Sequence, residues 1–160
     1  MGILEPMELG SLGPEKVRAC VYHSITAGLI NCLLFCLLVD LEDNMGVGVT
    51  LDEKTDMVRA ATGWDVTTYE LLKAGERAFT LARLFSVREG HTAADDRLAE
   101  RSFGPTTSGP LADGGIDRED LEAAIHTYYG MMGWDRETGV PLPEKLQELG
   151  VGWAVEHLSG

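Results

Sequence analysis

An apolar run from Leu29 to Val39 is the feature that most constrains how this chain can fold. The run is eleven residues long and carries Cys32 and Cys36, two of the three cysteines of the chain. A helix made from it would have no polar face to present to water, so other protein must surround it. It is too short to span a bilayer, which takes about 20 apolar residues. We therefore predict a deeply buried helix, or one piece of a larger assembly that covers it.

Length and composition narrow the class of protein. The chain has 160 residues, of which 44% are hydrophobic, enough for one domain with a core. Its formal net charge of -13 argues against nucleic acid or an anionic membrane surface as a partner. Three cysteines are too few for a disulfide scaffold and favour a reducing, cytoplasmic setting. The first residues show no signal or transit peptide.

The pattern along the chain predicts an all-α domain. Residues 1–13 are rich in glycine and indicate an irregular lead-in, and Pro14 suits the first position of a helix. No segment alternates convincingly between apolar and polar residues, so we expect few or no strands. Capping residues and helical periodicity predict helices at 14–39 (continuous or broken near Gly28), 50–61, 67–86, 117–133, 143–149 and 153–158.

The cysteines leave several interpretations open. On a helix, Cys32 and Cys36 would share one face and could hold a metal together. The plainer interpretation is that both are small core residues, because free cysteine is often buried. A redox sensor would need exposed thiols near positive charge, whereas these lie in an apolar run. A four-thiolate cluster needs four cysteines, so this chain can supply only part of such a site.

Charged residues interrupt the otherwise apolar segment 67–90. Glu76 and Arg83 are seven residues apart, so they share a helix face. They form either a solvated face or a buried ionic lattice that holds loops in place, which is costly unless every group is paired. For Asp95 and Asp96 we expect a helix cap or a salt bridge to Arg97 or Arg101. The four histidines are scattered, without the spacing of a metal-binding motif.

A set of short motifs occurs along this chain in a specific order and spacing. They are Ala60-Ala61-Thr62-Gly63-Trp64-Asp65, Gly75-Glu76-Arg77, Leu84-Phe85-Ser86-Val87-Arg88-Glu89-Gly90, Asp95-Asp96-Arg97-Leu98 with Arg101, Tyr128-Tyr129 with Gly133-Trp134-Asp135, Gly139-Val140-Pro141, and Leu146-Gln147-Glu148-Leu149-Gly150. In this order they resemble the C-terminal portion of the tungsten-dependent aldehyde:ferredoxin oxidoreductase family. The resemblance covers roughly residues 15–150.

The resemblance implies a fold, an activity and a set of cofactors. Members of this family are much longer chains that hold tungsten between two pterin dithiolenes, beside a four-iron four-sulfur (4Fe–4S) cluster. They oxidise aldehydes to carboxylic acids and pass the electrons to ferredoxin. Three cluster cysteines belong to an upstream motif that this chain lacks. The fourth belongs to a later D-x-x-G-L-C segment, and the aspartate and the backbone beside the glycine serve pterin binding.

The segment from Asn31 to Cys36 stands where that D-x-x-G-L-C segment is expected. The resemblance makes Cys36 the fourth cluster ligand and places Asn31, Leu34 and Phe35 beside one pterin. Asn31 replaces the aspartate and keeps a hydrogen-bonding amide without its charge. Leu34 replaces the glycine and adds a side chain where the family backbone is bare.

Two hypotheses from different classes follow. In the first, residues 14–160 form the C-terminal all-helical domain of such an oxidoreductase, with no catalytic residue of its own. Its partners are the upstream domains or a separate subunit, and ferredoxin; the isolated chain would bind no cofactor and not turn over. In the second, the chain is a cofactor-free structural or interaction module. That module would be indifferent to Cys36→Ala and would form a homo-oligomer that hides bare apolar surface.

Overall fold

The computed structural model describes residue 7 and residues 10–36, 48–109, 112 and 114–158. These residues are mostly helical, and the extended pairing recorded among them is one antiparallel bridge between Trp134 and Pro141. The all-α prediction is therefore confirmed. Within the described part of the chain, no helix is both long and apolar enough to cross a membrane.

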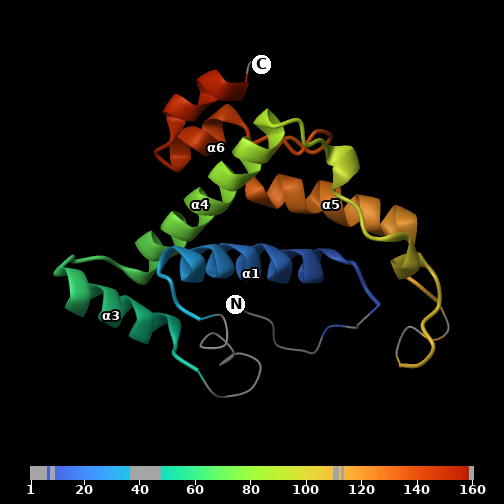
Figure 1. Cartoon of the computed structure of the whole chain (residues 1–160), viewed down its shortest axis with the longest axis horizontal. Coiled ribbons are helices and arrows are strands. Elements are labelled where there is room, and N and C mark those ends of the chain that lie inside the picture. Colours follow the sequence, from blue (N-terminus) through green and yellow to red (C-terminus); the bar gives the residue numbers. More distant parts are fainter. Residues whose placement is uncertain (1–6, 8–9, 37–47, 110–111, 113, 159–160) are drawn as a thin grey trace.

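Three helices form the body of the domain. Helix α4 (Thr68–Arg88) crosses α1 (Pro14–Cys32), and α5 (Arg118–Met132) also packs on α1 (Figure 1). Helix α3 (Leu51–Thr62) lies at the end where α1 finishes and α4 begins. Helix α6 (Pro143–Glu148) and the 3₁₀ helix η4 (Gly152–Leu158) cover the other end of α4. Two 3₁₀ turns, η2 (Ala93–Asp95) and η3 (Glu100–Phe103), connect α4 to α5.

The predicted helix starts are set by local side-chain chemistry. The Thr50 hydroxyl accepts the Glu53 amide at 3.0 Å, and the Glu53 carboxylate reaches back to the Thr50 amide at 2.8 Å. Thr67 and Glu70 repeat this capping box at the start of α4. Helix α3 stops at Gly63, whose φ of +74° is a left-handed conformation that glycine adopts freely. These boundaries confirm the capping analysis.

Helices α1 and α4 meet through two glycines. A Cβ atom on Gly75 would lie 2.4 Å from the backbone oxygen of Ile25, and one on Gly28 would lie 2.8 Å from the oxygen of Gly75. The two backbones therefore touch where side chains would normally separate them. Helix α1 passes through Gly28 without a break, because this glycine provides close packing and not a helix end.

The core consists of two clusters on either side of α4. One joins Leu84 to residues of the C-terminal segment, chiefly Leu146 and Leu149. The other contains Val21 of α1, together with Tyr129, Met132 and Trp134.

The prediction of one buried helix over the apolar run is wrong. Helix α1 ends at Cys32, in the middle of the run. Leu29 and Ile30 are buried, but Leu34 is 90% exposed. Residues 37–39, and all but the last residue of the predicted turn-rich exit at 40–48, lie outside the described residues. The helix stops because the chain turns through a left-handed residue, which apolarity does not reveal.

Candidate functional site

The segment that follows α1 forms a tight turn, here called the α1-terminal turn (Asn31–Cys36). The Phe35 amide donates to the carbonyl of Ile30 at 3.1 Å, and the Leu34 amide donates to that of Asn31 at 3.2 Å. These two bonds define a Schellman motif. Its left-handed position is Leu34, with φ of +58°, the one non-glycine residue with positive φ recorded among the described residues. The turn thus holds a leucine in a backbone conformation that favours glycine.

The α1-terminal turn presents most of its side chains to solvent. Asn31, Cys32, Leu34 and Cys36 are exposed, and Phe35 is half-buried. Cys32 ends the helix and Cys36 follows the turn, so the two do not share a helix face as predicted. The core interpretation of these cysteines is also wrong, because both thiols are exposed.

The turn fits a shared metal site better than a complete one. All three cysteines of the chain are described, and each is free. Among the described residues no group of three or more His, Cys, Asp or Glu side chains could hold a metal ion. An exposed thiol at Cys36 can still contribute one ligand to a site completed by other residues. Leu34 does not fit a bare-backbone contact with a pterin, because its side chain projects from the tip of the turn.

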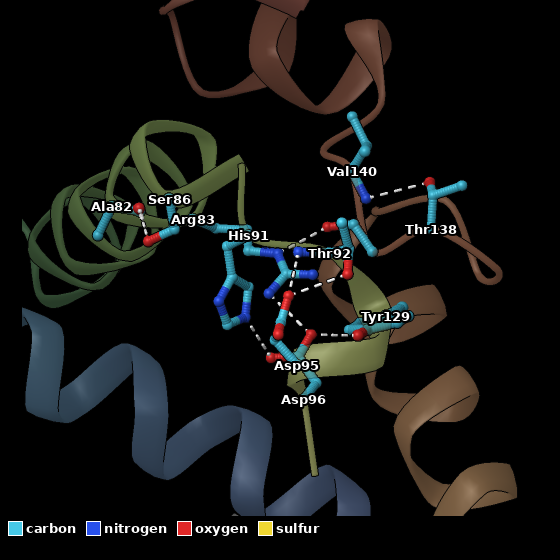
Figure 2. A network of polar contacts seen from close by, with 11 residues as sticks. Ala82, Arg83, Ser86, His91, Thr92, Asp95, Asp96, Tyr129, Thr138 and Val140 are labelled. Carbon is cyan, nitrogen blue, oxygen red and sulfur yellow. Dashed lines mark hydrogen bonds and ion pairs between the residues drawn. The ribbon is translucent and has the colours of Figure 1, made fainter. Parts of the chain in front are cut away.

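A second polar site surrounds Arg83, and we call it the Arg83 cluster (Arg83, His91, Asp96, Tyr129). The Arg83 side chain is only 8% exposed, and its Nη1 lies 2.7 Å from the Asp96 carboxylate. Its Nε donates to the carbonyl of Gly139 at 2.9 Å. The guanidinium also lies 5.4 Å from the ring centres of both Tyr129 and Trp134. Figure 2 shows Arg83, His91 and Tyr129 converging on Asp96 from three segments.

Asp96 is the centre of this cluster. Its carboxylate contacts His91 Nε2 at 3.0 Å and accepts a hydrogen bond from the Tyr129 hydroxyl. Burial alone would raise the pKa of Asp96, but the hydrogen bonds from Tyr129 and His91 and the charge of Arg83 lower it. Burial, reinforced by the Asp96 carboxylate, raises the pKa of Tyr129 to about 12. The predicted helix cap is confirmed at Asp95, whose carboxylate accepts the Thr92 amide at 2.8 Å at the start of η2. Asp96 pairs instead with Arg83 on α4, which neither the cap nor the predicted arginine partners anticipated.

Glu76 anchors a third set of contacts. Its carboxylate, 8% exposed, lies 2.7 Å from both Lys73 and Lys145. The next residue, Arg77, donates to the carbonyl of Leu149 at 2.6 Å. Together with Arg83, these contacts confirm the buried ionic lattice and exclude the solvated face. They fasten α6 and the 135–141 loop to α4.

Sequence reasoning missed how the lattice is completed. Tyr129, His91 and Gly139 come from three separate segments, and no spacing relates them. The sequence analysis had Tyr129 and Gly139 only in separate motifs, Tyr128-Tyr129 and Gly139-Val140-Pro141, and His91 in none. The Arg83–Asp96 pair holds these segments together, while Arg83 Nη2 and Trp134 Nε1 are buried without a hydrogen-bond partner among the described residues.

Comparison with known proteins defines the family of this helical domain. The profile described as "Aldehyde ferredoxin oxidoreductase, domains 2 & 3" matches residues 2–151. The tungsten-containing aldehyde ferredoxin oxidoreductase of Thermococcus kodakarensis is 31% identical over 153 residues, which cover 94% of this chain and 24% of that enzyme. The Pyrococcus furiosus enzyme of the same description is 29% identical over the same shares. The chain therefore belongs to the aldehyde ferredoxin oxidoreductase family and spans about a quarter of the length of these relatives.

A further relative and one solved structure also resemble this chain. The "Aliphatic sulfonate oxidoreductase, WOR-like subunit" of Pyrococcus furiosus is 34% identical over 101 residues, 59% of this chain and 16% of that one. Among solved structures, the active-site complex BamBC of benzoyl coenzyme A reductase matches with a TM-score of 0.72. The match covers 96% of this chain and 22% of that chain at 19% identity, so it establishes the fold alone.

Proposed function

We propose that residues 14–160 serve as the C-terminal domain of a tungsten-pterin, iron–sulfur oxidoreductase that converts aldehydes to carboxylic acids with ferredoxin as electron acceptor. The observation that carries this proposal is the exposed Cys36 thiol, at the position where the family resemblance expects the fourth cluster cysteine. Family membership over residues 2–151 supports the class of enzyme. The tungsten named in the relatives supports the metal.

Each residue of the turn has a distinct role in this proposal. Cys36 donates a thiolate to one iron of a 4Fe–4S cluster. Asn31 offers an amide that can both donate and accept a hydrogen bond at a pterin edge. Phe35 is half-buried and its amide is bonded to the Ile30 carbonyl, so this residue fixes the direction in which Cys36 leaves the turn beside the pterin. The cofactors supply the oxidation and the electron transfer, while the protein supplies position and electrostatics.

The proposal requires a partner polypeptide. Other cluster ligands and the second wall of the cofactor site must come from upstream domains or a separate subunit, because the described residues hold no complete metal site. Ferredoxin would accept the electrons, and free thiols on all three cysteines suit a cytoplasmic setting. Without that partner we expect the chain to bind no cofactor and to show no turnover.

Co-production tests this function. The chain is produced with a polypeptide of the same source that carries a closely spaced three-cysteine motif, and the purified complex is analysed for iron, tungsten and aldehyde oxidation. We expect iron and tungsten to co-purify only when both polypeptides are present. A stable complex that holds neither metal would contradict the proposal.

The cofactor-free module is the second candidate, and the departures at Asn31 and Leu34 favour it. The two buried charges of α4, Glu76 and Arg83, are also paired within this chain. This candidate predicts a well-folded, metal-free homo-oligomer that is unaffected by Cys36→Ala. Sedimentation of the wild-type chain and of the Cys36→Ala variant separates it from the first proposal.

A further inference from the structure

Leu34 combines two unfavourable features, and little of the described chain packs against its side chain. Its φ of +58° brings the Cβ atom of an L-residue too close to the following carbonyl oxygen. Its side chain is 90% exposed, the largest exposed fraction recorded for a large hydrophobic residue among those described. Glycine or asparagine would suit the same turn without the strain. The leucine therefore needs a reason that lies outside the described domain.

The surroundings of Leu34 are unusually free of charge. No Asp, Glu, Lys or Arg occurs between Arg18 and Asp40, although the chain carries 26 acidic and 13 basic residues. The α1-terminal turn also exposes the thiols of Cys32 and Cys36 on either side of the leucine. An uncharged, sulfur-bearing projection on an acidic chain has the character of an interface centre, where charged residues are depleted.

The turn also holds Leu34 in a fixed direction. The Schellman bonds from the Phe35 and Leu34 amides fix the backbone on both sides of its Cα atom. A side chain presented this way loses little conformational freedom on binding, which improves the affinity gained from each buried apolar group. Its position two residues before Cys36 couples any docking of the leucine to the placement of that thiol.

We propose that Leu34 is an apolar anchor for the polypeptide that completes the metal site of this chain. The isobutyl group enters an uncharged pocket of that polypeptide and sets the distance at which Cys36 meets the cluster. This inference rests on the proposed function, because the anchored partner is the one that supplies the remaining cluster ligands.

Two other occupants suit this site less well. A second copy would bring another net charge of -13, and the two acidic chains would repel each other. A pterin is recognised through hydrogen bonds at its ring edges, and an isobutyl group can form none. The relatives are about four times as long as this chain, so the family provides ample polypeptide for the face beside Cys36.

The test compares stability and affinity in the same variants. The full chain, as wild type, Leu34→Gly, Leu34→Ala and Leu98→Ala, is measured by thermal unfolding and by calorimetric titration with the three-cysteine polypeptide. Leu98 is exposed on a different segment and is the matched control. We expect Leu34→Gly to raise Tm yet weaken binding about tenfold or more, the usual size for a central interface residue. Leu34→Ala should weaken binding to a similar extent without raising Tm, and Leu98→Ala should leave Kd within about twofold.

The outcomes separate this inference from the proposed function. A metal-containing complex whose affinity is the same for wild type and Leu34→Gly overturns the anchor and leaves the proposed function intact. A loss of pterin at unchanged affinity assigns the leucine to the cofactor, and a wild-type dimer abolished by Leu34→Gly assigns it to a second copy; both overturn the inference. If the wild-type chain binds no three-cysteine polypeptide, the proposed function fails and the anchor fails with it.

Discussion

The Arg83 cluster and the α1-terminal turn are opposites in the same small domain. Around Arg83, charged and aromatic groups from α4, α5 and two loops are buried or half-buried and contact one another. At the end of α1, apolar and sulfur-bearing side chains face solvent from a strained turn. Most polar groups of the first region find a partner within the chain, with Arg83 Nη2 and Trp134 Nε1 as exceptions among the described residues. The second has no partner within the described residues.

This contrast indicates how the work of the domain is divided. The ion pairs and glycine contacts lock α1, α4 and α6 into one rigid unit. The rigid unit then presents one short turn, whose thiol and leucine are free to meet another molecule. Under the proposed function, this domain would position one cluster ligand, and the chemistry would belong to the cofactors.

Removing the central charge of the Arg83 cluster should have the largest effect. Arg83→Met keeps much of the side-chain stem but leaves Asp96 without its cation, which typically costs about 3–5 kcal/mol for a buried pair. Chemical denaturation of the full chain measures the free energy of unfolding. Arg88→Met, at an exposed pair with Glu89, is the control and should cost less than about 1 kcal/mol. Equal losses of unfolding free energy in the two variants would mean that the Arg83–Asp96 pair does not hold these segments together.

Filling the α1–α4 crossing should have the next largest effect. Gly75→Ala places a methyl group 2.4 Å from the Ile25 carbonyl oxygen, so the helices must separate. We expect a loss of about 1–3 kcal/mol in unfolding free energy, in spite of the better helix propensity of alanine. Gly104→Ala, where the new Cβ atom would have no neighbour within 4 Å, is the matched control. A stabilised Gly75→Ala variant would contradict the close backbone contact.

The stability of the Arg83 cluster should fall in alkaline solution. The pKa of Tyr129 is about 12 in the folded chain, against about 10 for tyrosine in an unfolded one. Its contribution is present below about pH 10 and is lost as the pH rises toward about 12, at up to about 1.4 kcal/mol per pH unit. Unfolding followed from pH 8 to 12 should therefore show a decline that Tyr129→Phe flattens. The exposed Tyr69→Phe variant should keep the wild-type decline.

Asp96 should make the folded chain less stable in acid. Its pKa is lowered in the folded chain, so its stabilising contribution is present above the unfolded value of about 3.9 and is lost as the pH falls below it. Asp96→Asn should be less stable than wild type at neutral pH, and the difference should shrink in acid. If the difference in unfolding free energy between the two proteins stays constant from pH 7 to pH 3, Asp96 does not cause the loss of stability in acid.

Relieving the strain in the α1-terminal turn should have the smallest effect. Leu34→Gly removes the left-handed strain and is expected to raise the free energy of unfolding by about 1 kcal/mol, partly offset by the greater freedom of glycine in the unfolded chain. Leu142→Gly, at an exposed leucine with φ of -71°, should not be stabilised. A destabilised Leu34→Gly variant would mean that the leucine already contributes packing inside the domain.

Most of the helical framework could be predicted from local sequence, because the signals lie within one turn of each helix end. Thr50, Thr67 and Asp117 start helices at the expected positions, and Gly63 and Gly133 end them in left-handed conformations. The end of α1 could not be predicted in this way. Leu34 occupies a left-handed position that sequence rules reserve for glycine or asparagine, so the apolar run looked continuous.

The candidate site shows the same difference between local sequence signals and contacts that depend on the tertiary fold. The alignment of Cys36 with a cluster cysteine came from a family motif, and the exposure of its thiol came from the structure. For Asp95 and Asp96 the sequence predicted a helix cap or a nearby arginine. Asp95 does cap η2, whereas the partner of Asp96 is the distant Arg83 on α4. Pairings between distant segments depend on the tertiary fold, and a single sequence carries no register for them.

The most direct test of the central claim is the iron content of the co-produced complex when Cys36 or Cys32 is replaced by alanine. Cys36→Ala should lose the 4Fe–4S cluster or reduce its iron severely, while Cys32→Ala, at a thiol that is also exposed four residues away, should keep the wild-type iron content. Full iron content in the Cys36→Ala complex would contradict the account, because the metal site would then be complete without this chain.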